Sequence, residues 1–443
     1  MRDLARLFPN ILAAACVSAL AMDARSDDIL LPSLLDPEIL SILQEHRALI
    51  SESVHETEPS GSAVALVFDN ELVWAEGFGT TQRGNQRPVD AETLFSVQSV
   101  SKTYTATAVM KAVQEKRVSL GRSITRYLPD FRVRSRFSER PERDLSLRLL
   151  LSHYAGFPHE APIGNNFKIE DASFSEHIQS LGDVWLRHPV GERYAYSNLG
   201  IDLAGHILVV RYGMPFERVM ERLVFEPLAL DRTTADPEEI LADQNRAVGQ
   251  SEKHESIPVT IPMIPSGGVY ASVRDMATFM QFHLKEGMLG AQRVIDKDVL
   301  RLMYTTQIEE TGAGETYRLG VSWSEMSYGG TVVNILGHSG SGFGFSSAMY
   351  WVPGQGLALA IVANSDTNAI LSSIHTSLMK RILSQKLGEQ SLVGDNLDSA
   401  LSTKTLDEDR IGRIEGTYTG SSQQNELVRK DGMPGWQFRN SFS

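Results

Sequence analysis

The chain has 443 residues, 42% of them hydrophobic and 22% charged, which are the proportions of a globular protein with a sizeable core. Its 42 Lys and Arg residues against 55 Asp and Glu residues give a formal net charge of −13. An acidic surface repels phosphate backbones and anionic headgroups, so the composition gives no support for a nucleic-acid partner.

The N-terminal residues have the pattern of a signal peptide. Arg2 and Arg6 precede an apolar run, and Ala19-Leu20-Ala21 has the small-x-small form of a cleavage site. We therefore expect residues 1–21 to be removed and the protein to be periplasmic or secreted. Two alternatives are an amphipathic helix and, more weakly, a lipid attached to Cys16. No stretch approaches the roughly 20 apolar residues of a membrane span.

The first half of the chain predicts a helix, a hairpin and a second helix. Residues 34–55 carry apolar residues at helical spacing. Residues 63–68 and 72–75 are apolar runs on either side of the turn signal Asp69-Asn70, so they predict two antiparallel strands. The pattern is helical again from Thr103 to about Glu115.

The second half predicts a long helical and loop region, then a helix, a hairpin and a last helix, with no internal repeat of the first half. After a mainly helical and loop region over 120–260, Ser272 to Asp275 resembles a capping box that opens a helix through Phe282. Two β-rich runs, 345–351 and 357–362, flank Pro-Gly-Gln-Gly and predict a hairpin. Residues 370–383 predict an amphipathic helix.

Strands at both ends with helices between them indicate an α+β fold. We expect a three-layer α/β/α domain over 30–385, whose antiparallel sheet is built from both ends of the domain around an inserted helical lobe. Residues 386–413 are polar and acidic and predict a linker. Residues 414–443 predict a short β-rich remnant, too small for an independent domain.

Ser99-Val100-Ser101-Lys102 is the first pattern with chemical meaning. On a helix, residues three apart share one face. The positive field at a helix N-terminus disfavours an ammonium, so a neutral Lys102 is able to accept the proton of Ser99. A second copy, Ser377-Leu378-Met379-Lys380, predicts only a solvated helix face.

Two later patterns, Tyr196-Ser197-Asn198 and His338-Ser339-Gly340, add further candidate residues for the same catalytic site. A phenol such as Tyr196 can pass a proton to a leaving group, and an amide such as Asn198 can hold a substrate carbonyl. In His338-Ser339-Gly340 the glycine allows close approach of a substrate to a strand edge. Taken singly, these residues also fit a core phenol, a helix cap and a loop histidine, but their order and spacing favour a site.

With these motifs the chain resembles the class C β-lactamase-like and penicillin-binding serine hydrolases. These include D-alanyl-D-alanine peptidases, D-amino-acid peptidases and carboxylesterases. The resemblance covers roughly residues 50–385. It also rests on Thr93-Leu94-Phe95, on the segments 149–156 and 265–270, and on Gly337 to Gly340.

The resemblance implies a β-lactamase/transpeptidase-like fold and a role for each motif residue. Ser99 would be the acylated nucleophile, with Lys102 and Tyr196 as the acid/base pair and Asn198 orienting substrate. The segment His338, Ser339, Gly340 and Ser341 would bind substrate, with the N–H groups of Ser99 and Ser341 as the oxyanion hole. No metal or organic cofactor is implied.

One departure bears on the substrate. His338 stands where many β-lactamases have Lys-Thr-Gly, and an unperturbed histidine is mostly neutral near pH 7.5, so a fixed carboxylate anchor is missing. The sequence therefore favours a peptidase or amidase acting on small peptides, including peptides with D- or unusual residues. A carboxylesterase is the alternative, followed by a β-lactamase and by a penicillin-binding protein that acylates without turnover.

Overall fold

The computed structural model describes residues 28–388 with short gaps, and three strands near the C-terminus. The gaps are 57–60, 85–86, 167, 169–170, 252–256, 306–315, 329 and 366–368. The expected signal peptide, with Cys16, and most of the expected linker lie outside the described residues.

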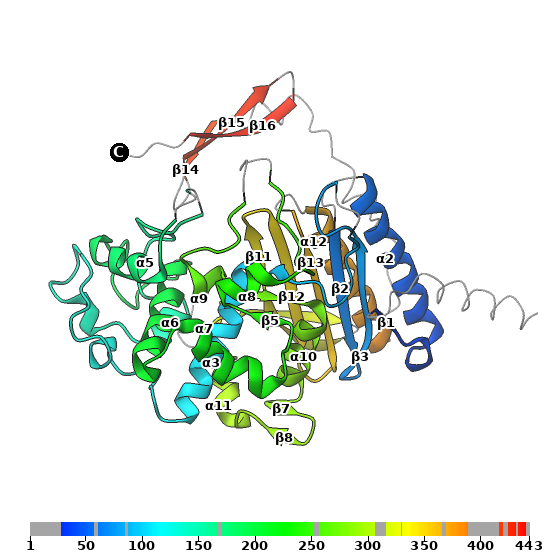
Figure 1. The fold of residues 1–443 in the computed structure, drawn as a ribbon, viewed down its shortest axis with the longest axis horizontal. Coiled ribbons are helices and arrows are strands. Elements are labelled where there is room, and N and C mark those ends of the chain that lie inside the picture. Colours follow the sequence, from blue (N-terminus) through cyan, green and yellow to red (C-terminus); the bar gives the residue numbers. More distant parts are fainter. Residues whose placement is uncertain are drawn as a thin grey trace, which may run out of the picture. The chain divides into compact units, whose positions relative to one another are not determined.

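The main unit is built on an eight-stranded antiparallel sheet with the strand order β1-β3-β2-β13-β12-β11-β10-β9 (Figure 1). Its N-terminal and C-terminal halves meet where β2 pairs with β13, with Ser62 opposite Ala363. The prediction of one sheet assembled from both ends of an α+β domain is confirmed. The strands are β1 (Ile29–Leu30), β2 (Gly61–Phe68), β3 (Glu71–Gly79), β9 (Thr316–Tyr317), β10 (Ser322–Tyr328), β11 (Thr331–Gly342), β12 (Phe345–Val352) and β13 (Leu357–Ala363).

Helices cover both faces of this sheet, which explains why its central strands are apolar throughout. In β13, Leu357, Leu359 and Ile361 pack in the cluster that contains α2 and α12. Ala358 and Ala360 face the other layer, which contains α3 and α10. A strand buried on both faces reads as a continuous hydrophobic run rather than an alternating one. The result is the expected three-layer arrangement.

The helices of the main unit lie in two outer layers, and most of them belong to the lobe inserted between β3 and β9 (Figure 1). They are α2 (Pro37–Glu56), α3 (Ser101–Gln114), α4 (Leu147–Leu151), α5 (Phe174–Ser180), α6 (Asn198–Tyr212), α7 (Phe216–Met220), α8 (Pro237–Ala242), α9 (Ile264–Gly267), α10 (Val273–Leu284), α11 (Lys297–Arg301) and α12 (Ala369–Leu387).

Two short sheets complete the main unit. The first has the order β4-β6-β5, and the second is the pair β7-β8. Their strands are β4 (Phe95–Ser96), β5 (Thr233–Thr234), β6 (Tyr270–Ala271), β7 (Met288–Leu289) and β8 (Gln292–Arg293).

One predicted helix start and one predicted capping box need correction. The first helix begins at Pro37 rather than at residue 34, because the Asp36 carboxylate accepts a hydrogen bond from the Ile39 N–H (2.8 Å) and Pro37 occupies the first turn. At the helix after residue 272, the Ser272 hydroxyl caps the Asp275 N–H, but the Asp275 carboxylate binds Arg232 and Thr233 instead of closing a capping box.

A second compact unit comprises residues 392–443. Its described part is a three-stranded antiparallel sheet of β14 (Gly416–Thr419), β15 (Gln424–Lys430) and β16 (Met433–Arg439), with β15 in the centre. The end of α12 at Leu387 lies two residues inside the expected linker 386–413.

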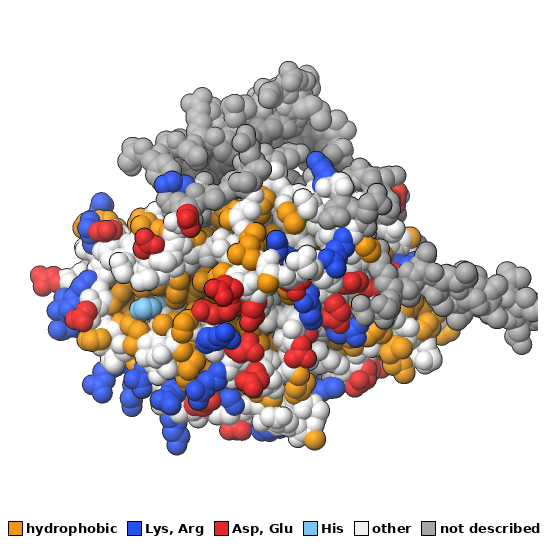
Figure 2. Space-filling view, in the orientation of Figure 1, with side chains coloured by type: hydrophobic (Ala, Val, Ile, Leu, Met, Phe, Trp, Pro, Cys, Tyr) orange, Lys and Arg blue, Asp and Glu red, His pale blue; other side chains and the backbone are white. Residues whose placement is uncertain are grey.

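The surface charge is unevenly distributed. Figure 2 shows Asp and Glu side chains over the middle of one face and Lys and Arg side chains gathered along its lower left. Six cationic residues line one surface cavity of about 640 Å³, namely Lys116, Arg117, Arg122, Arg126, Arg148 and Arg211. Among the described helices, none is both long enough and apolar enough to cross a membrane.

Candidate active site

Ser99 lies in a single 3-10 turn, Gln98–Val100, that leads directly into α3. Gln98 has φ of 49°, a left-handed conformation that is costly outside glycine, and its amide donates to the Ser96 hydroxyl (2.8 Å). The sequence pattern predicted that Ser99 and Lys102 share one helix. Instead, Ser99 precedes the helix that contains Lys102. The turn leaves Ser99 half-buried while its neighbours Gln98 and Val100 are buried.

Helix α3 is buried almost all round, and hydroxyl side chains fix its position. Thr103 donates to the Gly320 carbonyl (2.9 Å), Thr105 donates to the Pro265 carbonyl (2.7 Å), and the Ser101 hydroxyl accepts from the Val269 N–H (3.0 Å). These bonds satisfy polar groups that would otherwise be costly to bury. They hold the start of α3 against both neighbouring segments.

Lys102 is fully buried and contacts the nucleophile. Its Nζ lies 3.0 Å from Ser99 Oγ and 2.8 Å from the Ser266 carbonyl oxygen. Burial lowers the pKa of Lys102 from 10.5 to about 7, although Asp202 and Glu160 partly oppose this shift. Near pH 7 a large fraction of Lys102 is therefore a neutral amine, the form that accepts a proton.

Tyr196 approaches the same hydroxyl from the lobe. Its phenol hydrogen-bonds Ser99, and its ring centroid lies 5.2 Å from Lys102 Nζ. Burial raises the pKa of Tyr196, so the phenol stays protonated at neutral pH. Near pH 7 Lys102 is thus the group that can accept a proton, while the raised pKa makes Tyr196 a weak acid that can pass a proton on only if it receives another.

A histidine and a tyrosine that the sequence analysis did not single out pack around Tyr196. The His153 ring lies 4.4 Å, centroid to centroid, from Tyr196 and from Tyr317. His153 Nδ1 accepts from the Ser197 N–H (3.2 Å), and burial holds its pKa well below the usual value, so this ring is neutral. His153 lies in the 149–156 segment already noted for the resemblance.

His338 is neutral for a stronger reason than its ordinary pKa. Burial, with the nearby Lys102 as a second cause, lowers the pKa of His338 to about 3. Its Nε2 lies 3.0 Å from the Tyr317 hydroxyl, and its Nδ1 contacts the Ser339 carbonyl oxygen. The position that carries a fixed positive charge in many β-lactamases is therefore uncharged here across physiological pH.

Asn198, the first residue of α6, faces a carboxylate that sequence patterns did not indicate. Glu160 Oε1 accepts from Asn198 Nδ2 (3.1 Å) and from Asn166 Nδ2 (2.7 Å), and it also contacts His159 Nδ1 (2.7 Å). Glu160 Oε2 and Asn198 Oδ1 are buried acceptors without a hydrogen-bond partner among the described residues. Ser197, not Asn198, occupies the N-cap position.

Among the described strands, the segment from His338 to Gly342 of β11 pairs with β12 only. Pairing with β10 ends at Gly337 opposite Ser322, whereas pairing with β12 continues to Gly342. A Cβ atom on Gly340 would stand 2.8 Å from the Ser99 backbone nitrogen and 2.5 Å from the Val97 carbonyl oxygen. Only glycine allows β11 to lie this close to the nucleophile.

A cavity of about 510 Å³ opens onto these groups. Six of the eight site residues expected from the sequence line it, namely Ser99, Tyr196, His338, Ser339, Gly340 and Ser341. Tyr194 and Tyr317 add aromatic walls, while Lys102 and Asn198 are buried. Among the described residues, no group of three or more His, Cys, Asp or Glu side chains is placed to hold a metal ion.

The fold and the Ser–Lys–Tyr cluster together define the class of serine hydrolases that carry a lysine beside the nucleophile. Comparison with known proteins agrees with this class. The Beta-lactamase family profile matches residues 46–374, and the chain belongs to this family.

Similarity to individual members is low but extensive. The chain is 25% identical over 310 residues to the D-alanyl-D-alanine-carboxypeptidase/endopeptidase AmpH of Escherichia coli K12, covering 68% of this chain and 79% of that protein. It is 26% identical over 345 residues to penicillin-binding protein 4 of Amycolatopsis lactamdurans, covering 74% and 86%. The octameric penicillin-binding protein homologue from Pyrococcus abyssi has the same fold, with a TM-score of 0.67, 23% identity and coverage of 88% and 86%.

Proposed function

We propose that this protein is a peptidase or amidase that cleaves small peptides through an acyl-enzyme on Ser99. The observation that carries the proposal is the 3.0 Å contact between Ser99 Oγ and a buried Lys102 whose pKa is about 7. Lys102 takes the hydroxyl proton while Ser99 Oγ attacks the substrate carbonyl. The relatives named as a carboxypeptidase/endopeptidase and a penicillin-binding protein support this substrate class.

The remaining steps use the other groups at the cavity. The backbone N–H groups of Ser99 and Ser341 stabilise the oxyanion, and a donor of this kind is typically worth about 3 kcal/mol in the transition state. The proton that Lys102 took from Ser99 passes through Tyr196 to the leaving amine as the C–N bond breaks, so that Lys102 is neutral again and Tyr196 keeps a proton. Water then attacks the acyl-enzyme and gives a proton to Lys102, and this proton returns to Ser99 Oγ as the acyl C–O bond breaks and the acid product leaves.

An amide substrate is favoured over an ester by the acceptors beside Asn198. Glu160 Oε2 and Asn198 Oδ1 are buried and have no hydrogen-bond partner in the described part of the chain, and an unmet buried acceptor costs about 1–3 kcal/mol. An amide N–H or an ammonium group of a peptide supplies the missing donor, whereas a simple ester supplies none. The carboxylate charge of Glu160 adds a preference for a cationic group on the acyl side.

A carboxylesterase is the second candidate. The neutral His338 and the aromatic side chains of Tyr194 and Tyr317 favour an uncharged, aromatic leaving group. The same neutral position disfavours efficient turnover of β-lactams, whose carboxylate lacks a cationic partner here.

A substrate panel separates these candidates. The purified protein is assayed with D- and L-aminoacyl amides, short peptides, p-nitrophenyl esters and a chromogenic cephalosporin. Turnover of amides or peptides supports the proposal, and rapid ester cleavage with no amide turnover replaces it with an esterase. A fluorescent penicillin tests acylation separately, because a label on Ser99 that forms and never decays indicates a binding protein without turnover.

We also propose that the protein is exported with loss of residues 1–21. The basic residues, apolar run and Ala19-Leu20-Ala21 site support this. Intact-mass measurement of the protein recovered from the periplasm or medium tests it, and a mass that retains residues 1–21 overturns it.

A further inference from the structure

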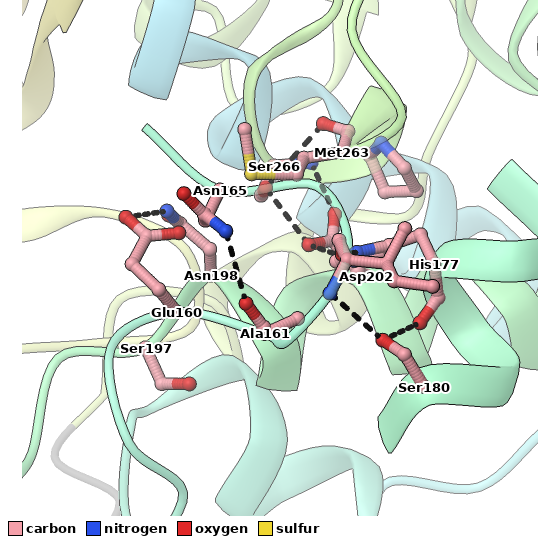
Figure 3. Close-up of polar contacts among 12 residues, drawn as sticks. Glu160, Ala161, Asn165, His177, Ser180, Ser197, Asn198, Asp202, Met263 and Ser266 are labelled. Carbon is pink, nitrogen blue, oxygen red and sulfur yellow. Dashed lines mark hydrogen bonds and ion pairs between the residues drawn. The ribbon is translucent and has the colours of Figure 1, made fainter. Parts of the chain in front are cut away.

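The Ser266 carbonyl that contacts Lys102 belongs to a buried chain of hydrogen bonds that the proposed mechanism does not use. Figure 3 shows this chain running from Ser266 through Asp202 to His177. The Ser266 carbonyl that accepts from Lys102 belongs to α9, and Ser266 is itself held by Asp202 of α6. Asp202 Oδ1 accepts the Ser266 N–H (2.9 Å), and Asp202 Oδ2 accepts the Ser266 hydroxyl (3.0 Å). Because Asp202 accepts two hydrogen bonds from Ser266, the orientation of the Ser266 backbone is fixed.

The chain ends at His177 of α5, which is fully buried with Asp202. His177 Nδ1 lies 2.7 Å from the Ile163 carbonyl oxygen, and Nε2 lies 3.0 Å from Asp202 Oδ2. A neutral imidazole donates only one hydrogen bond, but both ring nitrogens here face oxygen acceptors. Burial alone lowers the pKa of His177, but the bonds to Asp202 and Ile163 outweigh it, and the pKa is raised. Both the two oxygen contacts and the direction of the pKa shift favour the imidazolium form of His177 beside Asp202.

A buried ion pair of this kind adds little to the stability of the folded protein by itself. Burying two charges is costly, and well-packed apolar residues of the same volume are often equally stable or more so. Its position suggests a different use, because Asp202 is separated from the amine of Lys102 only by Ser266. The Asp202 charge raises the pKa of Lys102 and so favours the inactive ammonium. A positive charge on His177 opposes that effect.

We propose that Asp202 and His177 are positioning residues which, through Ser266, point the lone pair of Lys102 at the Ser99 hydroxyl. This inference rests on the proposed function. A neutral amine has two N–H bonds and one lone pair. When one N–H donates to the Ser266 carbonyl, the lone pair is free to face Ser99 Oγ at 3.0 Å. A displaced Ser266 carbonyl would turn the amine away from its target.

Other titratable groups also face Lys102 and the pair. Glu160 lies in the lobe and acts electrostatically on both Lys102 and His177. Tyr196 contacts Ser99, while His153 and His338 are neutral neighbours whose own pKa values Lys102 lowers. None of these groups bonds to Ser266 in the described structure. Variants of the pair therefore test a separate route to Lys102.

The test measures the acylation rate as a function of pH in three variants. The compared quantity is the acid limb, the pH range over which the rate rises as Lys102 loses its proton. Asp202→Asn removes the negative charge but keeps an acceptor for the Ser266 N–H. His177→Gln keeps a donor near Asp202 but removes the positive charge. His46→Gln is the matched control, because His46 is equally buried with both nitrogens bonded, to the Ile42 carbonyl and the Ser377 hydroxyl, in the opposite layer.

We expect the two variants of the pair to move the acid limb in opposite directions by about one pH unit. Asp202→Asn moves it to lower pH, because the ammonium of Lys102 loses a stabilising charge. His177→Gln moves it to higher pH, because the Asp202 charge is no longer balanced. His46→Gln leaves it unchanged. Unmoved limbs in folded variants, or limbs that move the same way, overturn the inference.

A truncation measures the positioning itself. Asp202→Ala frees the Ser266 backbone, and misplacement of a catalytic group typically costs up to about 10²-fold in rate. We expect acylation to slow by at least tenfold while KM changes little. An unchanged rate in a folded Asp202→Ala protein contradicts a positioning role.

Two further measurements keep the inference separate from folding and from the proposed function. In ¹⁵N-histidine spectra of the unmodified protein at pH 7.5, His177 should have two protonated nitrogens and His46 one. A singly protonated His177 overturns the charged pair even if the variants fail to fold. If the unmodified protein is never acylated on Ser99, the proposed function fails, whereas acylation with unmoved limbs rejects only the role of the pair.

Discussion

The chain contains the Ser-x-x-Lys pattern twice, and the two copies differ in almost everything except spacing. Ser99 and Lys102 lie at the start of the buried helix α3, where Lys102 has no exposed surface. Ser377 and Lys380 lie in the middle of α12, where Lys380 is exposed and Ser377 Oγ contacts His46 Nε2 (3.2 Å). Only the first lysine reaches its serine in a low-dielectric environment.

The difference shows that burial and hydrogen-bond partners, not spacing, make the motif reactive. Lys102 loses hydration on every side and receives only neutral oxygen partners, so its proton is weakly held. Lys380 keeps its hydration shell. Variants at equivalent positions of the two copies therefore measure what the environment contributes.

The largest expected effect is the difference between removing the Ser99 hydroxyl and removing the Ser377 hydroxyl. Ser99→Ala should abolish labelling by a fluorophosphonate or fluorescent penicillin and reduce turnover by at least about 10⁴-fold, since no other group at the cavity forms the acyl-enzyme. Ser377→Ala should label at the rate of the unmodified protein. Residual labelling of Ser99→Ala, located by mass spectrometry, would show that the nucleophile lies elsewhere.

Replacing the two lysines comes next. Lys102→Met should lower the acylation rate by about 10³-fold, because general-base catalysis typically contributes 10²–10⁴-fold. Lys380→Met should have no effect. In the unmodified protein the rate should rise with pH through about 7 as Lys102 becomes neutral. A rate that is flat between pH 5 and 9 would contradict this role for Lys102.

The same two variants differ in the pH dependence of their stability. The pKa of Lys102 is about 7 in the folded protein and 10.5 when unperturbed, so between these values the unfolded chain binds more protons. The unfolding free energy of the unmodified protein therefore gains from rising pH over this range, relative to Lys102→Met. Urea denaturation from pH 7 to 10 measures the gain, and Lys380→Met should show none.

A smaller effect is expected at Glu160, for which the second copy has no counterpart. The Glu160 carboxylate raises the pKa of Lys102, so Glu160→Gln should shift the acid limb of acylation to lower pH by about half a unit. The glutamine retains a carbonyl oxygen for Asn198. Glu45→Gln is the control, because Glu45 of α2 forms an ion pair with Arg381 of α12. A shift to higher pH would mean that the carboxylate does not act on Lys102 by charge.

The last effect concerns stability alone, with no expected change in activity, and belongs to the second copy of the motif. Ser377→Ala leaves the buried His46 Nε2 without its hydroxyl partner, which should cost about 1–2 kcal/mol of unfolding free energy. Thermal unfolding measures the cost. No loss of stability would show that the hydroxyl contributes nothing to the packing of α12 on α2.

Local patterns were sufficient for two hairpins of the main sheet, for four of the eleven described α-helices (α2, α3, α10 and α12) and for the order of the site motifs. The first helix was predicted too early, because Leu34 and Leu35 fit its apolar period although Asp36 and Pro37 mark its start. The Ser99 turn was predicted as helix, because a 3-10 turn continues into α3 without a break in the pattern.

The supporting residues of the site were not predictable in the same way. Asn198 bonds to Glu160 across 38 residues, His177 bonds to Asp202 across 25, and Ser266 bonds to Asp202 across 64. Pairs this far apart leave no periodic signal, and each acidic residue alone is indistinguishable from a surface charge. Only the packing of α5, α6 and α9 shows that they meet.

The pairing of β2 with β13 has a consequence for biosynthesis. Ser62 of β2 can pair with Ala363 of β13 only after about 300 further residues have been synthesised. At ribosomal speeds of about 5–20 residues per second this synthesis takes roughly 15 to 60 s. During that interval two apolar strands, β2 and β3, lack the neighbour that completes their sheet. A nascent chain thus stays unable to react, and prone to aggregate unless a chaperone shields it, until its final strands emerge.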